Sequence, residues 1–419
     1  MQKAHICILS HQTLQNVLPL NSHGADYVFV AVSKEMHEQN RHTTFAQVLV
    51  DLNLVKSADR VVTLEPIPST DFAKMRQWAD QQIALIRSIT PQGRITLNAT
   101  GGTKLMSLAL IESLKQPSVG DIEIIYCDTF NDTLETIYPM VYQAPLQPDI
   151  LTAEDILKAH GIKQTGAQSD HKAWRDAVQQ RAALTMHLGT NMSGPLAVFV
   201  SSLNAELARK IGGENLANTH LPLQLTLGTG VSSDWNYVLT LMSELGLISL
   251  QEPLAEHKPA RFAVNTLEAV RYLHGVWLEE YLWLCFEQAK ISDIASGAEI
   301  SSLHQDQAFK DNELDLVAGH RNNLVIVECK TANISRQQVL NQALDKLDGI
   351  SRRSGGLLAE RWFATARWPN EKNAEEREQA ERFRLQAKER GVVLIEPKHL
   401  ANLIDRLKEW KKTARFPLN

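Results

Sequence analysis

Two acidic residues and a lysine in the C-terminal third of the chain could carry out hydrolysis together. Asp315 precedes Glu328 by thirteen positions, and Lys330 follows Glu328 after one residue, in the stretch NELDLVAGHRNNLVIVECK. Hard divalent cations take oxygen ligands and keep several waters, one of which can attack a phosphorus atom. An ammonium group nearby can act on that water or offset charge in the transition state. These residues favour metal-dependent phosphodiester hydrolysis, with an ion pair at a strand end as the alternative.

The same stretch has the alternation of a β-hairpin. ELDLVA alternates acidic and apolar residues, GHRNN reads as the turn, and LVIVECK reads as the returning strand. Side chains alternate between the two faces of a strand, so Asp315 shares a face with Val317, and Glu328 shares one with Lys330. A hairpin with this turn allows Asp315 and Glu328 to meet at one edge of a sheet.

This pattern resembles the core of the PD-(D/E)XK nucleases. Asp315 matches the first acid of that family, and Glu328-Cys329-Lys330 matches its (D/E)-x-K element. The resemblance implies that Asp315, Glu328 and the main-chain carbonyl of Cys329 hold Mn²⁺ or Mg²⁺, and that Lys330 acts on the attacking water.

The resemblance also implies a glutamate from the helix before the hairpin. HGVWLEEYLWLCFEQAK, which begins at His274, is a helix candidate. Similarity to the GxWLE pattern of the family favours Glu279 over Glu280. A solvated helix carboxylate is the alternative for Glu279.

A strand end in the N-terminal third carries residues suited to an anionic ligand. In RITLNATGGTKLMSLALIESLK, a strand passes through Gly101 and Gly102 into a helix that begins near Thr103. Two glycines let the backbone approach a ligand, and the free amides at a helix start favour negative charge. Thr100, Thr103 and Lys104 add hydroxyl groups and a cation. Neither a Walker A loop nor the dinucleotide fingerprint is present, and a tight turn without a ligand is the alternative.

The stretch NATGGTK resembles the ligand-loop motif of CARF domains, the sensors of cyclic oligoadenylate in CRISPR defence. A CARF domain followed by a PD-(D/E)XK core is the layout of a group of CRISPR-associated ancillary nucleases, and both motifs occur here in that order. The residues that the resemblance implies contact the adenylate ring are Asn98, Thr100, Gly101, Gly102, Thr103 and Lys104. Further candidates at matching strand ends are Ser10, Gln12 and Ser33.

The elements that must position these residues follow from hydrophobic periodicity. Five apolar runs alternate with helical segments at the start of the chain, namely AHICILS, DYVFVAVS, DRVVTLEP, RITLNAT and DIEIIYCDT. This alternation predicts a parallel, doubly wound sheet with ligand sites at the carboxyl ends of its strands. We predict a Rossmann-like CARF domain over 1–150, a helical, winged-helix-like coupling segment over 151–264, and a restriction-endonuclease-like α/β domain of the PD-(D/E)XK type over 265–419.

Composition narrows the class of protein. The 419 residues are 44% hydrophobic and 22% charged, as in globular proteins. No apolar run approaches the roughly 18 residues that a membrane-spanning helix needs, and the N-terminus is too polar for a signal peptide, so we expect a cytoplasmic protein without a membrane partner. The four cysteines form no Cys-x-x-Cys pair, which argues against a disulfide framework and a structural zinc site. A net charge of -5 argues against coating of duplex nucleic acid by bulk charge.

Three functions compete. The first is a metal-dependent endonuclease that cleaves single-stranded DNA or RNA, or nicks duplex DNA, when a cyclic oligoadenylate, preferably cyclic tetra-adenylate, binds a homodimer in type III CRISPR antiviral defence. The second is a ligand-dependent transcriptional regulator with a degenerate nuclease-like core, against which the intact Asp315, Glu328 and Lys330 argue. The third, a nucleotide-cofactor domain as in dehydrogenases, is disfavoured by the missing fingerprint.

Overall fold

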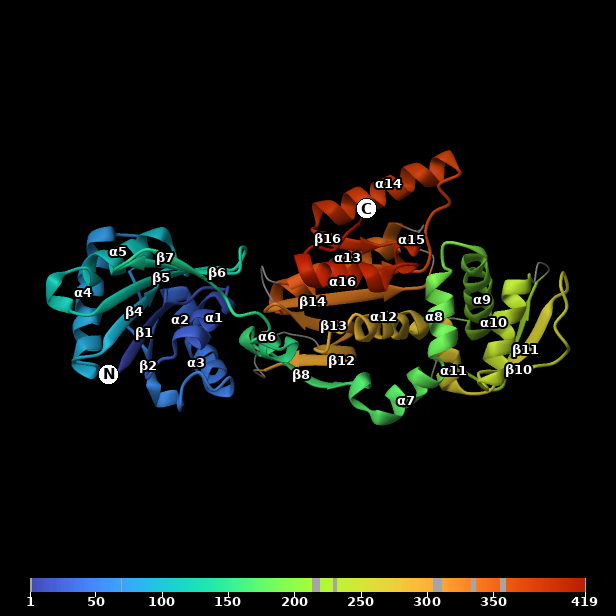
Figure 1. Ribbon diagram of the computed structural model, residues 1–419, viewed down its shortest axis with the longest axis horizontal. Coiled ribbons are helices and arrows are strands. Elements are labelled where there is room, and N and C mark those ends of the chain that lie inside the picture. Colours follow the sequence, from blue (N-terminus) through green and yellow to red (C-terminus); the bar gives the residue numbers. More distant parts are fainter. Residues whose placement is uncertain are drawn as a thin grey trace. The chain divides into compact units, whose positions relative to one another are not determined.

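The computed structural model describes residues 2–68, 70–212, 219–228, 232–303, 311–332, 337–354 and 359–418. The chain divides into an N-terminal unit over Met1–Lys163 and a C-terminal unit that takes up most of Gln164–Asn419. Figure 1 draws the first unit in blue to cyan and the second in green to red. Within the described ranges, no helix is both long and apolar enough to cross a membrane.

The N-terminal unit is built on a seven-stranded sheet with the order β3-β2-β1-β4-β5-β6-β7. Its strands are β1 (Lys3–Ile8), β2 (Tyr27–Ala31), β3 (Val61–Thr63), β4 (Arg94–Asn98), β5 (Ile122–Asp128), β6 (Thr133–Tyr138) and β7 (Tyr142–Pro145). The first five are parallel, whereas β6 and β7 add an antiparallel edge. Buried apolar residues predominate in β1, β2, β4 and β5 because helices cover both faces of the sheet. The predicted parallel, doubly wound sheet is confirmed.

Helices cover the two faces of this sheet. They are α1 (Leu14–His23), α2 (Lys34–Glu38), α3 (Arg41–Asp51), α4 (Phe72–Ile89) and α5 (Lys104–Leu114), while α6 (Ala153–Ala159) packs against α1 and α3. The α4 and α5 helices pack on one face, where Ile6, Ile8 and Leu97 join their buried side chains in one core. Figure 1 shows α1 and α3 on the opposite face. The chain order reverses at β1, whose two neighbours are β2 and β4, so the carboxyl ends of these strands form the crevice in which such sheets bind ligands.

The C-terminal unit contains a mixed six-stranded sheet with the order β16-β15-β14-β13-β12-β8. The strands are β8 (Ile162–Ala167), β12 (Ile294–Ser302), β13 (Asn312–His320), β14 (Asn323–Lys330), β15 (Ala359–Thr365) and β16 (Val392–Ile395). The β12, β13 and β14 strands are antiparallel, and β14, β15 and β16 are parallel. The carboxyl ends of the last three strands therefore lie at one edge of the sheet.

A second, three-stranded antiparallel sheet belongs to the same unit. It has the order β10-β11-β9, formed by β9 (Leu223–Leu227), β10 (Ile248–Leu250) and β11 (Ala260–Val264). The helices of the unit are α7 (Lys172–Gln180), α8 (Ala182–Thr190), α9 (Pro195–Ile211), α10 (Ser233–Glu244), α11 (Leu267–Arg271), α12 (Trp277–Gln288), α13 (Gln337–Ser354), α14 (Ala374–Glu389), α15 (Pro397–Leu400) and α16 (Leu403–Thr413). One continuous core runs from Val178 through Phe262 and Trp277 to Trp410. The segments 151–264 and 265–419 thus meet in shared packing over most of their length.

The turn of the β13–β14 hairpin is shorter than the sequence indicates. GHRNN reads as a five-residue turn, but Gly319, His320 and Asn323 all belong to the paired strands. Only Arg321 and Asn322 form the turn, and both have positive φ angles, of 52° and 59°. Two consecutive residues in this conformation are typical of the tight turns whose twist matches paired strands. The ladder therefore starts directly at the turn, which fixes the register of the whole hairpin.

Candidate functional site

The far end of the β13–β14 hairpin brings two acids together. The register pairs Leu316 with Val327, and one further position places Asp315 opposite Glu328. The Oδ2 atom of Asp315 accepts a hydrogen bond of 2.6 Å from the main-chain N–H of Cys329. The structure therefore brings the first predicted acid to the (D/E)-x-K element.

Two lysines hold the Glu328 carboxylate. Lys330 Nζ donates to Oε1 at 2.6 Å, and Lys346 Nζ donates to Oε2 at 2.6 Å. Lys346 Nζ also lies 3.9 Å from Asp315 Oδ1. The Glu328 side chain is 4% exposed, whereas that of Lys330 is 35% exposed. An almost buried carboxylate is thus bonded to the ammonium groups of two partly exposed lysines.

Lys346 lies outside the sequence motif because it comes from α13, sixteen residues after Lys330. The helix pattern nevertheless carries a signal. Ala343 and Ile350 are buried, and Lys346 lies on the same helix face at spacings of three and four residues. A lysine that interrupts the apolar stripe of a helix is a candidate for a specific buried partner.

Glu279 reaches this edge from the first turn of α12. It lines a cavity of about 620 Å³ together with Glu313 and Asp315. The neighbouring Glu280 is fully buried, and its Oε1 atom accepts a hydrogen bond of 2.5 Å from Arg181. The structure thus places Glu279, the glutamate that the sequence favours, in the cavity and gives Glu280 a structural ion pair.

The start of α12 is fixed to the end of β14. A π-helix over Tyr272–Val276 precedes α12, and a Cβ atom on its Gly275 would lie only 2.8 Å from Thr331 Oγ1. Thr331 Oγ1 in turn donates to the carbonyl oxygen of His274 at 3.1 Å. Single π-turns of this kind are frequent at functional sites. These contacts hold Glu279 in place relative to the hairpin.

The charges at this edge shift one another's pKa. Burial, together with the Glu328 carboxylate, raises the pKa of Asp315 to about 6. Burial and the carboxylates of Asp315 and Glu313 raise the pKa of Glu279 well above its usual range. For Lys330, burial acts to lower the pKa, but the carboxylates of Glu328 and Asp315 outweigh it and raise the pKa. The edge therefore attracts positive charge beyond that of its lysines.

This set of donors fits a divalent cation. Two carboxylates face one another, both attract ammonium groups, and oxygen ligands are those that Mg²⁺ and Mn²⁺ prefer. Among the residues that the structure describes, no three His, Cys, Asp or Glu side chains are grouped so that they could hold a metal ion. Main-chain carbonyl oxygens or waters would therefore have to complete a coordination shell that Asp315 and Glu328 begin.

The predicted ligand loop follows β4, and packing explains its two glycines. A Cβ atom on Gly101 would overlap the carbonyl oxygen of Ile8, and one on Gly102 would overlap the Ile8 side chain. Gly102 also has a φ of +71°, which other residues adopt rarely. The sequence predicts that these glycines let the backbone approach a ligand, and the structure adds that they let the loop pack on the end of β1.

Asn98 and Thr100 are bonded within the protein. Asn98 is fully buried, and its Nδ2 donates to Gln15 O at 2.7 Å and to Asn16 Oδ1 at 3.0 Å. Its Oδ1 accepts from the N–H of Thr100 at 3.1 Å and from Thr100 Oγ1 at 2.6 Å. Thr100 Oγ1 also accepts from the N–H of Cys127 at 2.7 Å. All four hydrogen-bonding positions of the Asn98 amide are used, so this buried side chain holds the loop in a fixed conformation.

The later residues of the loop present more accessible groups. Thr103 caps α5, and its Oγ1 accepts a hydrogen bond of 3.3 Å from the N–H of Met106. Lys104 follows as the first residue of the helix, and its side chain is exposed. The start of α5 thus offers main-chain amides, a hydroxyl group and a cation together.

The candidates at neighbouring strand ends lie at the same edge of the sheet. Ser33 caps α2, with Oγ accepting from the N–H of Met36 at 3.2 Å, and Ser10 Oγ accepts from the N–H of Gln12 at 3.2 Å. Because β1 lies between β2 and β4 and all three run parallel, their carboxyl ends face the same crevice.

Family models match both architectures. A model described as the Card1 CARF domain matches residues 4–155, and one described as the Card1-like endonuclease domain matches residues 266–414. The first range contains the loop after β4, and the second contains Asp315, Glu328 and Lys330. The CARF domain and the nuclease domain predicted from the sequence are confirmed, in the predicted order.

Two solved structures share the fold of nearly the whole chain. Protein VC1899 from Vibrio cholerae is 18% identical, with a TM-score of 0.74 and 99% of each chain covered. Can2 from Sulfobacillus thermosulfidooxidans, in complex with cyclic tetra-adenylate, is 20% identical, with a TM-score of 0.70, and the match covers 98% of this chain and 99% of Can2. At these identities the likeness concerns the fold. A comparison with curated protein sequences finds no match.

Proposed function

Because the chain carries a Card1 CARF domain and a Card1-like endonuclease domain, we propose that it is an endonuclease activated by a cyclic oligoadenylate in type III CRISPR antiviral defence. The reaction is hydrolysis of a phosphodiester bond in single-stranded DNA or RNA, in the cytoplasm. The observation that carries the proposal is the sheet edge at which Asp315, Glu328 and Lys330 meet.

We propose Mn²⁺ or Mg²⁺ as the cofactor, held by the carboxylates of Asp315 and Glu328 and by the main-chain carbonyl of Cys329. When bound, the cation supplies positive charge that brings the scissile phosphate and an attacking water together. The support is the chemistry of the donors and the pKa of Asp315, which burial and Glu328 raise to about 6. Lys330 and Lys346 each donate to one Glu328 oxygen at 2.6 Å, and each of these oxygens keeps a second lone pair for a cation.

Lys330 and Glu279 have different proposed roles, one in stabilising charge and the other in accepting a proton. The raised pKa of Lys330 keeps its ammonium group protonated, which favours charge stabilisation at a phosphate oxygen over removal of a proton. Glu279 lines a cavity with Asp315, and burial together with the carboxylates of Asp315 and Glu313 raises its pKa, which makes its carboxylate a stronger proton acceptor. We therefore assign Glu279 to hold the proton of the attacking water, directly or through a second water.

The proposed activator is a cyclic oligoadenylate, with cyclic tetra-adenylate preferred because the similarly folded Can2 was solved in complex with it. Thr103, Lys104 and the amides at the start of α5 suit the phosphates of such a ring. We propose a symmetric homodimer, in which one ring spans two copies of the loop. Leu105 and Leu108 support this, because they are 44% and 47% exposed on the same helix and offer apolar surface beside the loop.

The first test is cleavage of labelled single-stranded DNA and RNA with Mn²⁺, with and without cyclic tetra-adenylate. We expect wild-type protein to cut only with the ligand and Lys330→Ala to lose cleavage. Lys408→Ala is the matched control, because Lys408 is exposed on α16 and pairs with Asp405 at 3.1 Å. Cleavage by Lys330→Ala at the wild-type rate would contradict the nuclease assignment. Ligand binding with specific binding to duplex DNA and no cleavage would favour the transcriptional regulator.

A further inference from the structure

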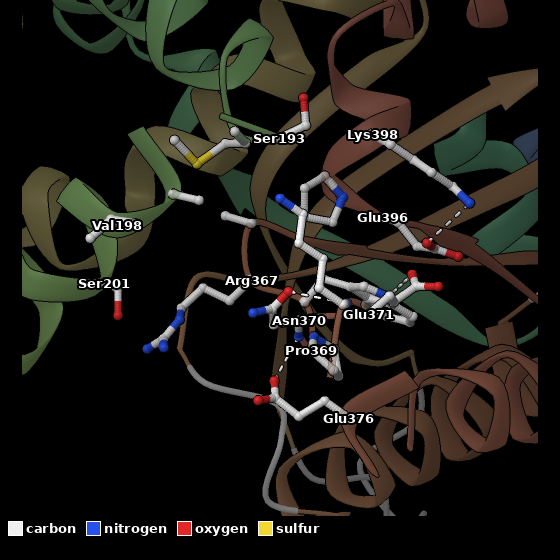
Figure 2. Close-up of a pocket in the computed structure, with 16 residues that line it drawn as sticks. Ser193, Val198, Ser201, Arg367, Pro369, Asn370, Glu371, Glu376, Glu396 and Lys398 are labelled. Carbon is white, nitrogen blue, oxygen red and sulfur yellow. Dashed lines mark hydrogen bonds and ion pairs between the residues drawn. The ribbon is translucent and has the colours of Figure 1, made fainter. Parts of the chain in front are cut away.

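A second cavity of the C-terminal unit lies at the carboxyl ends of β15 and β16. Its volume is about 750 Å³, within the roughly 300 to 1,000 Å³ of typical ligand sites. One wall is formed by residues 366–372, after β15, and by residues 396–398, after β16. The facing wall contains Ser193, Val198 and Ser201 at the start of α9, as Figure 2 shows.

The acidic residues of this cavity already have partners. Arg384 donates to Glu371 at 2.5 Å and to Glu396 at 2.6 Å. Lys398 lies 3.3 Å from Glu396, and Glu376 accepts a main-chain N–H bond of 2.6 Å. Arg384 and Lys398 therefore balance the charges of Glu371 and Glu396, whereas Glu376 is held by a main-chain amide.

Arg367 is the opposite case. Among the described residues, no carboxylate is recorded in an ion pair with its guanidinium, and burial, the sole influence found on its pKa, lowers that pKa. For comparison, hydrogen bonds from Glu396 and Glu371 raise the pKa of Arg384. Figure 2 shows the Arg367 side chain directed away from Glu371 and Glu396, toward the wall of Ser201. A half-buried guanidinium without a counter-charge favours an anionic ligand.

Both walls of the cavity adjoin the strand end that carries Lys330. Thr365 is the cross-strand neighbour of Lys330, and its Oγ1 accepts from the N–H of Arg367 at 3.2 Å. Asn204, on the α9 helix that also carries Val198 and Ser201, donates to the carbonyl oxygen of Thr331 at 3.0 Å. Arg367 is thus held two residues from the neighbour of a proposed catalytic lysine, at the same edge of the sheet.

We propose that this cavity binds the backbone of a single-stranded nucleic acid next to the scissile bond, with Arg367 contacting a phosphate. The inference rests on the proposed nuclease function. A guanidinium can bond two phosphate oxygens at once, and the hydroxyl groups of Ser193 and Ser201 can donate to phosphate or sugar oxygens. Val198, 60% exposed, offers apolar surface to a base. Contacts to the backbone carry no base preference, so the site should accept DNA and RNA strands of any sequence.

The experiment compares binding and cleavage in the full-length protein. Binding of fluorescein-labelled oligo-dT and oligo-U is measured by anisotropy, without divalent cation, over a range of salt concentrations. Arg367→Ala should weaken binding at least fivefold and lower the slope of log affinity against log salt by about 0.7, the value for one phosphate contact on a single strand. Arg367→Lys should recover part of the affinity.

A matched control removes the same charge elsewhere. Arg382 lies on α14, is 56% exposed and pairs with Glu378 at 2.8 Å, so Arg382→Ala should bind both probes as the wild type does. Ser201→Trp fills the cavity from the facing wall without changing the charge, and it should weaken binding and lower the salt slope as Arg367→Ala does, because the strand no longer reaches Arg367. Thermal unfolding of each variant checks that the fold is retained.

Hydrolysis of bis(p-nitrophenyl) phosphate with Mn²⁺ and cyclic tetra-adenylate separates this inference from the nuclease proposal, because that diester has no phosphate besides the scissile one for Arg367 to contact. For Arg367→Ala, the loss of kcat/KM on an oligonucleotide should exceed the loss on the small diester at least fivefold. Equal losses, or oligonucleotide binding as tight as that of Arg382→Ala, would overturn the inference. If wild-type protein hydrolyses neither substrate, the nuclease proposal fails, and the binding measurements still decide whether Arg367 holds a strand.

Discussion

At the end of β4, Asn98 has every polar atom of its side chain bonded within the protein. Beside the end of β14, by contrast, the pKa of Asp315 on β13 is raised to about 6. Both places are strand ends in α/β sheets, and both are proposed to bind charged partners. In the loop after β4, buried side chains order a backbone that presents its amides outward. At the β14 edge, the functional side chains themselves carry the imbalance of charge.

The difference indicates two ways of preparing a site. A loop that is ordered before its ligand arrives loses little conformational freedom on binding. A cluster of partly buried carboxylates is held at a cost to folding stability, and this cost is recovered when a cation binds to the folded state alone. Substitution of a buried side chain in the loop after β4 should therefore lower folding stability. Substitution of a carboxylate at the β14 edge should instead impair function while raising stability in the absence of a cation.

The largest effect is expected from Glu328→Gln. The change removes the carboxylate that bonds Lys330 and Lys346 and that is proposed to hold the cation. Cleavage of single-stranded DNA with Mn²⁺ and cyclic tetra-adenylate should fall at least about 10³-fold. Ligand affinity, measured by calorimetry, should not change. Glu409→Gln, an exposed carboxylate on α16, is the control, and residual cleavage within tenfold of wild type would contradict the assignment.

Asn98→Asp tests the ordered loop. Aspartate keeps the shape of asparagine but removes the donors to Gln15 and Asn16 and buries a charge. We expect the free energy of unfolding to fall by about 3 kcal/mol or more, measured with a chemical denaturant. Affinity for cyclic tetra-adenylate should fall with it. Asn21→Asp, on the exposed side of α1, should leave both quantities unchanged, and equal stability of the two variants would refute the buried network.

Asp315→Asn, unlike Asn98→Asp, should raise the free energy of unfolding when no cation is present. The folded protein holds the Asp315 proton up to a pKa of about 6, whereas the unfolded chain loses it near 3.8. Between these values the folded state binds more protons, so the contribution of Asp315 to stability falls as the pH rises. In chelator, the variant should therefore be the more stable protein, by at most about 3 kcal/mol, above about pH 6.

This difference should disappear below about pH 4, where Asp315 is protonated in both states. Mn²⁺ should stabilise the wild type and not the variant. Denaturant unfolding at several pH values, with chelator or with Mn²⁺, measures both effects. A variant that is less stable than wild type in chelator above pH 6 would show that the charge of Asp315 does not lower folding stability.

The smallest effect is expected from Lys104→Ala. Lys104 is exposed, so its loss should leave the free energy of unfolding within about 0.5 kcal/mol of wild type. Affinity for cyclic tetra-adenylate should drop about tenfold, because one charged contact to a phosphate is lost. Lys74→Ala, 72% exposed on α4, is the control, and equal ligand affinity of the two variants would remove Lys104 from the binding loop.

Local patterns allowed much of the fold and part of the site to be predicted. Alternation over 313–318 and 324–330 has a period of two and predicts the hairpin, but the two-residue turn at Arg321 and Asn322 sets the register that places Asp315 opposite Glu328. The five parallel strands were visible as apolar runs because both faces of such a sheet are buried. The glycine pair at 101–102 marked the turn after β4 because few other residues could form it.

The sequence by itself thus determined the two domains, the hairpin and the candidate residues Asp315, Glu328 and Lys330, since each depends on neighbours along the chain. Tertiary structure alone decided that Lys346 bonds Glu328, that Asn98 orders the loop and that the Arg367 guanidinium pairs with no carboxylate among the described residues around its cavity. These three roles depend on which helix packs beside which strand end. Such contacts join segments far apart in the chain, and no local period encodes them.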